Sequence, residues 1–235
     1  IRLSTSRDRG ESFTRASGAI RCPNMSAGMR RGPRVVRTKT AVVVTAIGGK
    51  QGKGRDGDLF AWHSTDDGAT WSEAVMVNDA PDAAREGLHG MTAGANGDVW
   101  CVWLDLRNGK TEIYTAMSND DGQTWNKNVK AYRSPGGSVC ECCHPSIIAR
   151  ENSGVSVLFR NSIGGQRDMF LLGSDDGQKF SIGRKLGKGS GKLDACPMDG
   201  GMLASDGKDQ LVTVWRRNNQ VFATLGNCQT EKQLG

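Results

Sequence analysis

Short apolar stretches separated by turn residues run through most of the chain. The first four are RVVR (34–37), TAVVVTAI (40–47), DLFAWHS (58–64) and SEAVMV (72–77). Runs of this length, rich in valine and aromatic residues and bounded by Gly, Asn or Asp, are typical of β-strands. The same plan recurs in VWCVWLDL (99–106), EIYTAMS (112–118), VSVLFRN (155–161), DMFLLGS (168–174), QLVTVWRR (210–217) and QVFATLG (220–226). The pattern predicts an all-β protein.

A motif of the form Ser-x-Asp-x-Gly-x-x-aromatic recurs at regular intervals. Its copies are SRDRGESF (6–13), STDDGATW (64–71), SNDDGQTW (118–125) and GSDDGQKF (173–180), the last with Gly173 in the serine place. Successive motif glycines are 54 to 58 residues apart, a period that suits one four-stranded propeller blade per repeat. We predict a hairpin turn in which Asp accepts backbone N–H bonds and Gly takes a positive φ. The aromatic residue is expected to anchor each turn between neighbouring blades.

These four motifs resemble the Asp-box repeats of sialidases and related sialidase-like propellers, and the resemblance covers nearly the whole chain. It implies a six-bladed β-propeller of four-stranded blades. At about 55 residues per blade such a ring needs more than about 300 residues. We therefore expect residues 1–235 to form a single domain with an incomplete ring: half a blade, three whole blades and most of another. Either the chain is part of a longer protein, or another chain completes the ring, or four blades close on themselves.

Composition and charge narrow the classes of partner. With 37% hydrophobic residues the chain can bury a core, and no apolar run approaches the roughly 18 residues of a membrane span. The net charge of +6 is scattered along the chain, with two Tyr and six Phe available for stacking, so we expect no nucleic-acid partner. The first residues, IRLSTSRDRG, lack signal-peptide features. Either a signal was removed or the chain starts within a longer protein.

Arginines gather in two sets of loops that a propeller places on one face. These loops precede the inner strand of each blade or join its second and third strands. A ring of guanidinium groups around the axis suits a carboxylate, sulfate or phosphate. We expect about half of these arginines to pair instead with acids such as Asp105, Asp168 or Glu86. The candidate ligand-binding arginines are Arg34, Arg85, Arg107, Arg160, Arg167 and Arg216.

For catalysis, the resemblance implies three arginines on the substrate carboxylate, a tyrosine activated by a glutamate as nucleophile, and an aspartate as acid–base group. The two tyrosines, Tyr114 and Tyr132, fall in predicted strands rather than axial loops. The family's Arg-Ile-Pro element is replaced by GPRVV (32–36). Position alone makes three carboxylates candidate acid–base groups: Glu86, Asp194 and Asp199.

Cysteine and histidine also gather in the loops before the inner strands. Of seven cysteines, Cys22, Cys140, Cys142, Cys143 and Cys196 lie there with His89 and His144. One interpretation is a copper or zinc site, since both metals favour thiolate and imidazole ligands. The other is a set of inter-loop disulfides among Cys22, Cys142 or Cys143, and Cys196 in an oxidising compartment. A cysteine nucleophile beside His144 is a third interpretation. The candidate metal ligands are Cys142, Cys143, His144, Cys196 and His89.

Two further expectations concern the pairing of Cys142 with Cys143 and the burial of Cys101. Adjacent Cys142 and Cys143 are not expected to pair with each other, because a disulfide needs Cα atoms about 4.4–6.8 Å apart with opposed Cβ directions. Cys101, inside the strand VWCVW (99–103), is expected to be a small buried hydrophobe.

Together these features predict an extracytoplasmic protein, periplasmic or secreted. Its expected function is to bind an anionic small molecule or acidic glycan at an arginine-rich axial face beside a Cys/His cluster. The first alternative is an exo-sialidase-type glycoside hydrolase acting on acidic sugars. The second is a copper- or zinc-binding redox protein.

Overall fold

The structure is a computed structural model that confirms an all-β fold. It describes residues 1–16, 18–151, 154–192, 198–205, 210–226 and 230–234. All sixteen regular elements found in these residues are strands. None of the chain described here forms a helix with the length and apolar character needed to cross a membrane.

The strands form four antiparallel sheets of four strands, and each sheet is a simple meander in chain order. The inner and second strands of each sheet are β1 (Arg34–Arg37), β2 (Val42–Gly48), β5 (His89–Ala93), β6 (Val99–Asp105), β9 (Ser146–Ala149), β10 (Val155–Arg160), β13 (Met202–Ser205) and β14 (Leu211–Arg217). The third and outer strands are β3 (Asp58–Ser64), β4 (Val75–Met76), β7 (Glu112–Ser118), β8 (Val129–Tyr132), β11 (Met169–Ser174), β12 (Arg184–Lys185), β15 (Gln220–Leu225) and β16 (Glu231–Gln233). The predicted apolar segments thus form the strands assigned to them.

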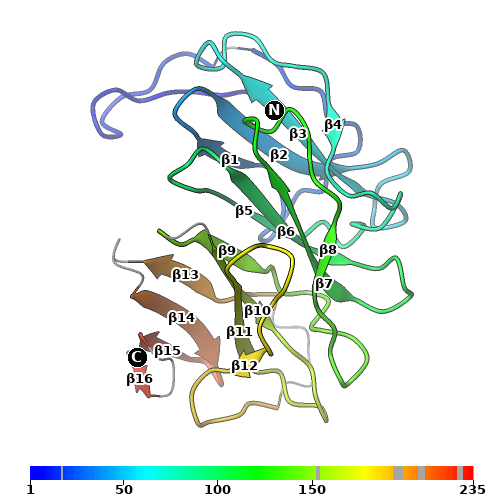
Figure 1. Ribbon diagram of the computed structural model, residues 1–235, viewed down its shortest axis with the longest axis vertical. Coiled ribbons are helices and arrows are strands. Elements are labelled where there is room, and N and C mark those ends of the chain that lie inside the picture. The colour runs from blue at the N-terminus through cyan, green and yellow to red at the C-terminus, as the bar shows by residue number, and fades with distance from the viewer. Residues whose placement is uncertain (17, 152–153, 193–197, 206–209, 227–229, 235) are drawn as a thin grey trace.

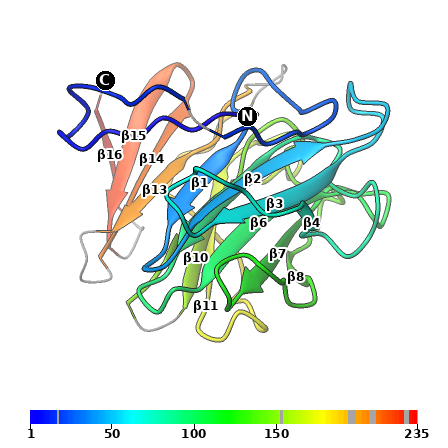
Figure 2. The same cartoon turned by 90° about the horizontal axis from the view of Figure 1, so that it is seen from above.

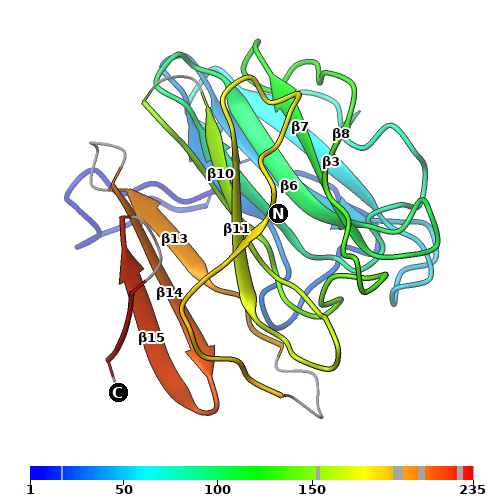
Figure 3. The same cartoon turned by 60° about the horizontal axis from the view of Figure 1, so that its bottom comes forward.

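The first strand of each sheet faces a common axis. β5 lies against both β1 and β9, and β9 lies against both β5 and β13. Figure 1 shows the four sheets as an arc with these four strands along its inner side. Figure 2 and Figure 3 show the same order from other directions, with the β1–β4 sheet at one end and the β13–β16 sheet at the other. This is the arrangement of successive propeller blades.

Three apolar clusters fill the spaces between consecutive sheets. One joins Leu59 of the first sheet to Trp103 of the second, and the next joins Trp100 to Phe159 of the third. The last joins Leu158 to Trp215 of the fourth sheet. Cys101 is fully buried in the first of these clusters, as predicted.

The Asp-box turns have the hydrogen bonds that the sequence predicts. In the second box, Thr70 donates its backbone N–H (2.9 Å) and its hydroxyl (2.6 Å) to the Asp66 carboxylate. The Ser64 hydroxyl also donates to Asp66 (2.7 Å) and accepts the Gly68 N–H (2.8 Å). Hydrogen bonds from Thr70 and Ser64 lower the pKa of Asp66 to about 2. The carboxylate therefore stabilises the turn, and each box aspartate lies in its own turn rather than in a shared site.

The fourth box differs from the alignment made on its glycine. Ser174, rather than Gly173, accepts the Gly177 N–H (2.8 Å), and its hydroxyl donates to Asp176 (3.1 Å). Ser174 ends β11 as Ser118 ends β7, so the turn is one residue shorter here. The serine place assigned to Gly173 was therefore wrong, because an alignment on glycine hides a deletion between the aspartate and the glycine of the turn.

The described N-terminal residues, where the sequence predicts half a blade, form a loose hairpin. The described residues before β1 contain no named strand. Ile1 and Ile20 exchange backbone hydrogen bonds of 2.7 and 2.9 Å, and the Thr14 N–H donates to the Thr5 carbonyl (2.9 Å). The first box closes this hairpin through Ser6 and its neighbours. These contacts form no named strand among the described residues, so the half blade stays a prediction.

Replacing Ser118 by Ala tests the box. Ser118 is buried, and its hydroxyl accepts the Gly122 N–H (2.8 Å). Without that acceptor a buried donor is left unpaired, which costs about 1–3 kcal/mol of unfolding free energy. Chemical denaturation of S118A measures this loss. S6A removes the same bonds from the exposed first box and should cost less than about 0.5 kcal/mol. Equal losses in both variants would contradict this account.

Candidate axial site and its flanking cavities

A cavity of about 340 Å³ lies where the inner strands of all four sheets meet. Arg34 of β1, His89 of β5 and Ser146 of β9 line it, as does Met202 of β13. His144, just before β9, completes the polar part of the lining. The four inner strands thus bring together side chains that are distant in sequence, at the place where the sequence predicted a ligand site.

Arg34 is the principal charge in this axial cavity and has no carboxylate partner among the described residues. Its guanidinium donates to the carbonyls of Arg30 (2.8 Å), Pro33 (3.1 Å) and Gly32 (3.2 Å). Arg30 also lines the cavity. Burial, followed by the like charge of Arg30, lowers the pKa of Arg34. A half-buried cation held only by backbone dipoles beside a second cation favours an anion in the cavity.

The two histidines of the cavity are buried and neutral. Burial and then the charge of Arg34 lower the pKa of His89 to about 3. Burial, Arg30 and Arg34 lower the pKa of His144 to about 4. His89 Nε2 lies 3.0 Å from the Thr45 hydroxyl, and the two groups share a hydrogen bond. The Nδ1 atoms of both histidines are buried and have no partner in the described chain.

Arg107 is held in place by acids, as the sequence allowed. It donates to Asp105 through Nε and Nη2 (both 2.9 Å) and to Asp79 through Nη1 (2.6 Å). Its guanidinium lies 4.2 Å from the centre of the Tyr114 ring. Because its guanidinium donors are used in these contacts, Arg107 stabilises the loop after β6 and has few donors left for a ligand.

Arg160 and Arg216 share one carboxylate. Arg160 Nη2 lies 2.9 Å from Asp199 Oδ1, and Arg216 Nε lies 2.7 Å from Asp199 Oδ2. The Arg160 side chain is 1% exposed and also donates to the carbonyls of Arg167 and Arg216. Asp199 would have to give up an ion pair to act as an acid–base group. This triad fixes the third sheet to the fourth.

Two further cavities meet at Glu86. One, of about 500 Å³, is lined by Glu86, Glu141, Arg167 and Lys110. The other, of about 460 Å³, is lined by Arg85 and Glu86. Burial, followed by the nearby Glu141 carboxylate, raises the pKa of Glu86. Glu86 and Arg167 therefore share one cavity, whereas Arg34 lies in another.

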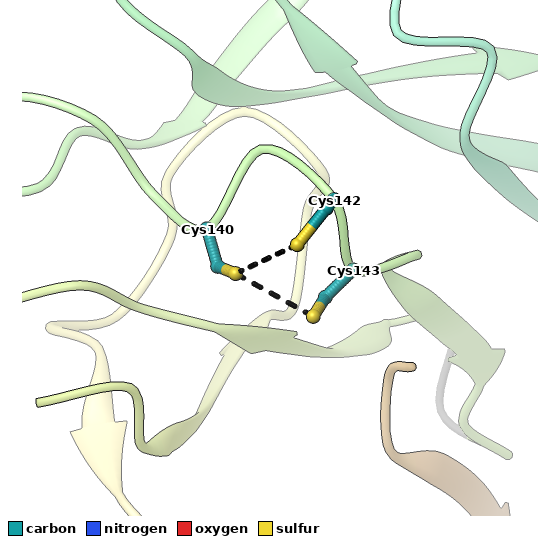
Figure 4. A group of neighbouring side chains, drawn as sticks. All are labelled: Cys140, Cys142 and Cys143. Atoms are coloured by element: carbon teal, nitrogen blue, oxygen red, sulfur yellow. Dashed lines mark hydrogen bonds between the residues drawn. The ribbon is translucent and has the colours of Figure 1, made fainter. Parts of the chain in front are cut away.

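Three cysteine sulfurs form a cluster at the turn before β9. The sulfur of Cys140 lies 3.5 Å from that of Cys143 and 3.6 Å from that of Cys142 (Figure 4). In the described part of the chain these three cysteines are the group whose metal-binding atoms all lie within 4.8 Å of one another. Cys22, Cys101, Cys140 and Cys143 are free thiols, and Cys142 makes a further contact.

The predicted metal ligands therefore separate into two places. Cys142 and Cys143 belong to the cluster of three cysteines, whereas His89 and His144 line the axial cavity. Cys196 and Asp194 lie outside the described residues.

The two tyrosines lie away from the axial cavity. Tyr114 packs against Trp103 and receives a hydrogen bond from Asn108 (3.3 Å). The Tyr132 hydroxyl accepts a hydrogen bond from Asn161 (2.8 Å). Burial raises the pKa of both phenols, which is opposite to the activation that a nucleophile needs.

Sequence reasoning missed several contributors to these sites. Arg30, Thr45 and Met202 belong to no motif, and Cys140 was left out of the metal set. The Cys-x-x-Cys spacing of Cys140 and Cys143 was a signal that could have identified the thiol pair.

Comparisons with known proteins agree with the fold. The sequence model of the BNR repeat-like domain matches residues 31–204. No curated protein matches the chain in sequence. A protein of unknown function from Dyadobacter fermentans is 16% identical with a TM-score of 0.56, over 83% of this chain and 60% of that one.

Two structures with described activities are similar. An α-L-arabinofuranosidase of Fusarium graminearum has a TM-score of 0.62 at 13% identity, over 99% of this chain and 72% of that one. The NanB sialidase from Streptococcus pneumoniae has a TM-score of 0.56 at 17% identity, over 98% of this chain and 34% of that one. At these identities the likeness shows a sialidase-like β-propeller fold.

Replacing Asp199 by Ala tests the triad that fixes the third and fourth sheets. The change leaves the buried Arg160 guanidinium without its counter-charge, which costs about 3–5 kcal/mol of unfolding free energy. The control is D67A, which breaks the exposed pair with Arg37 (2.7 Å) and should cost no more than about 1 kcal/mol. Denaturant unfolding measures both. A small loss in D199A, equal to that in D67A, would contradict the role of the triad.

Proposed function

Because the chain belongs to the BNR repeat-like family, we propose that it is a sialidase-like propeller that binds an acidic carbohydrate in the axial cavity. The observation that carries the proposal is the half-buried Arg34 guanidinium, which donates hydrogen bonds to backbone carbonyls and has Arg30 as its neighbour. A ligand carboxylate would supply the missing negative charge and could accept paired hydrogen bonds.

The rest of the cavity suits the remaining parts of a sugar. Neutral His89 has a buried Nδ1 without a partner, and a ligand hydroxyl could form a hydrogen bond with it. The apolar side chains of Met91, Ile147 and Met202 form other parts of the lining. A few convergent polar groups among apolar walls are typical of small-ligand sites.

Three further expectations remain predictions. Copper or zinc would bind at the cysteine cluster that contains Cys142 and Cys143, and metal analysis of protein purified without chelators tests this. Another chain, or more of the same protein, would complete the ring. The protein would lie in an extracytoplasmic compartment.

A second candidate function is glycoside hydrolysis, and the pairing of Glu86 with Glu141 favours it. Both carboxylates line the 500 Å³ cavity, and the pKa of Glu86 is raised by burial and by Glu141. A carboxyl whose pKa is raised holds its proton more tightly and can protonate a leaving-group oxygen, while a second carboxylate acts as base or nucleophile. The arabinofuranosidase and sialidase neighbours are glycosidases by their own descriptions.

Calorimetric titration with sialic acid and with its methyl ester tests the binding proposal. Wild-type protein should bind the acid and lose most of its affinity for the uncharged ester. R34A should bind the acid at least about tenfold more weakly, because the loss of one charged hydrogen-bond partner costs more than about 1.4 kcal/mol. R37A, in the same strand but paired with Asp67, is the matched control and should bind like wild type. Equal affinity for acid and ester would refute an anion site.

Release of a fluorogenic aglycone from aryl sialosides and arabinofuranosides tests hydrolysis separately. If Glu86 is the general acid, the rate should fall as pH rises through its raised pKa, because the protonated form is the active one. E86Q should lose at least about 100-fold in rate, and E73Q, at an exposed position, should lose none. Activity that survives in E86Q would remove Glu86 from the mechanism without affecting the binding proposal.

A further inference from the structure

Two free thiols face each other across a tight turn, apart from the axial cavity. Cys140 and Cys143 are 2% and 1% exposed, and their sulfurs are 3.5 Å apart (Figure 4). Residues 141 and 142 form the turn between them. The Cα atoms at the two ends of a β-turn lie within about 7 Å, close to the span that a disulfide requires.

The backbone around the turn is fixed on both sides. The Cys140 N–H donates to the Arg160 carbonyl (3.0 Å), and the Val139 N–H donates to the Thr111 carbonyl (2.9 Å). After the turn, the Ser146 hydroxyl donates to the Gly201 carbonyl (2.7 Å). The two sulfurs are therefore held near each other by the sheets, so bond formation needs a short movement of side chains.

The surroundings of Cys140 favour its thiolate. Arg167 Nη1 lies 3.5 Å from the Cys140 sulfur. The Cys140 thiol points at the Cys143 sulfur (3.5 Å). A positive charge beside one of two sulfurs favours the thiolate of that sulfur, so Cys140 is the better nucleophile of the pair.

Access to the pair is one-sided. Cys140 lines the 500 Å³ cavity with Arg167 and Lys110, whereas Cys143 is absent from that lining. A molecule that enters the cavity therefore meets the Cys140 sulfur first. Glu86 and Glu141 line the same cavity, so the attraction for a small disulfide that carries a carboxylate comes from Arg167 beside the Cys140 sulfur.

We propose that Cys140 and Cys143 form a redox-active dithiol that exchanges with small anionic disulfides, with Cys140 as the attacking thiol and Cys143 as the resolving thiol. This site is distinct from the axial carbohydrate site, and Cys140 shares the 500 Å³ cavity with Glu86 and Glu141.

The exchange is balanced in two steps. The Cys140 thiolate attacks one sulfur of the incoming disulfide, forms a mixed disulfide and releases the other half as a thiolate, which takes up a proton. The Cys143 thiol loses its proton and attacks the Cys140 sulfur, which forms the Cys140–Cys143 disulfide and releases the second half as a thiol. The protein dithiol is oxidised by two electrons, and one substrate disulfide is reduced to two thiols.

The linkage can be mapped in the wild-type protein with oxidised glutathione as the probe. After equilibration in glutathione buffers, free thiols are alkylated and trypsin releases residues 134–150. A glutamate-specific protease then cuts between Glu141 and Cys142. The two fragments should stay joined until reduction, and tandem mass spectrometry should place the link at Cys143. The joined fraction should follow a single two-electron transition with the glutathione ratio.

Variants assign the two roles. In C143S, attack by Cys140 should stop at a stable mixed disulfide, seen as a mass gain of one glutathionyl group at Cys140. C140S should give neither the mixed disulfide nor the joined fragments, whereas C142S should keep the Cys140–Cys143 link. Thermal unfolding of each variant identifies any that fails to fold, and the wild-type linkage map does not depend on the variants.

Several results would overturn the proposal. They are an absence of joined fragments at every glutathione ratio, a link from Cys140 to Cys142, a glutathionyl group on Cys143 in place of Cys140, and thiols that react only after a bound metal has been removed.

Discussion

The close packing of the third and fourth Asp-box turns on the preceding sheets is the constraint on which the rest of the structure depends. Gly122 of the second sheet lies against Val43 of the first, where an added Cβ would come within 2.8 Å of a valine methyl. Gly177 of the third sheet lies in the same way against Trp100 of the second. Both glycines have positive φ, so neither the space nor the backbone conformation suits another residue. These contacts help to set the spacing of the sheets and bring their inner strands to one axis.

That convergence places many cations near the axis, and ion pairing then separates them by role. Arg107, Arg160 and Arg216 meet carboxylates from their own or neighbouring sheets, and these pairs stabilise the fold. Arg34 meets backbone carbonyls and Arg30 instead. The cost of holding two like charges together in a partly buried place is offset when an anion binds. This difference in partners is the physical basis for assigning a ligand site to Arg34.

The sequence predicted most of the fold because its evidence is local: strand periodicity and turn chemistry each lie within a few residues. The register of the fourth box was missed because Ser174 replaces Gly173 through a one-residue deletion that a glycine alignment hides. The functional sites were predicted only by region. Whether an arginine binds a ligand or an acid depends on partners distant in sequence, as Arg107 and Arg34 show. The pair of Cys140 and Cys143 was not identified from the sequence, because the loop that contains both cysteines allows several interpretations.

The central claim is that the axial cavity holds an anion through Arg34. A crystal structure of the protein soaked with sialic acid tests it most directly. The account predicts density for the sugar in the axial cavity, with its carboxylate within hydrogen-bond distance of the Arg34 guanidinium and a hydroxyl at His89 Nδ1. Density confined to the cavity beside Glu86, or an axial cavity left without the sugar at saturating concentration, would contradict it.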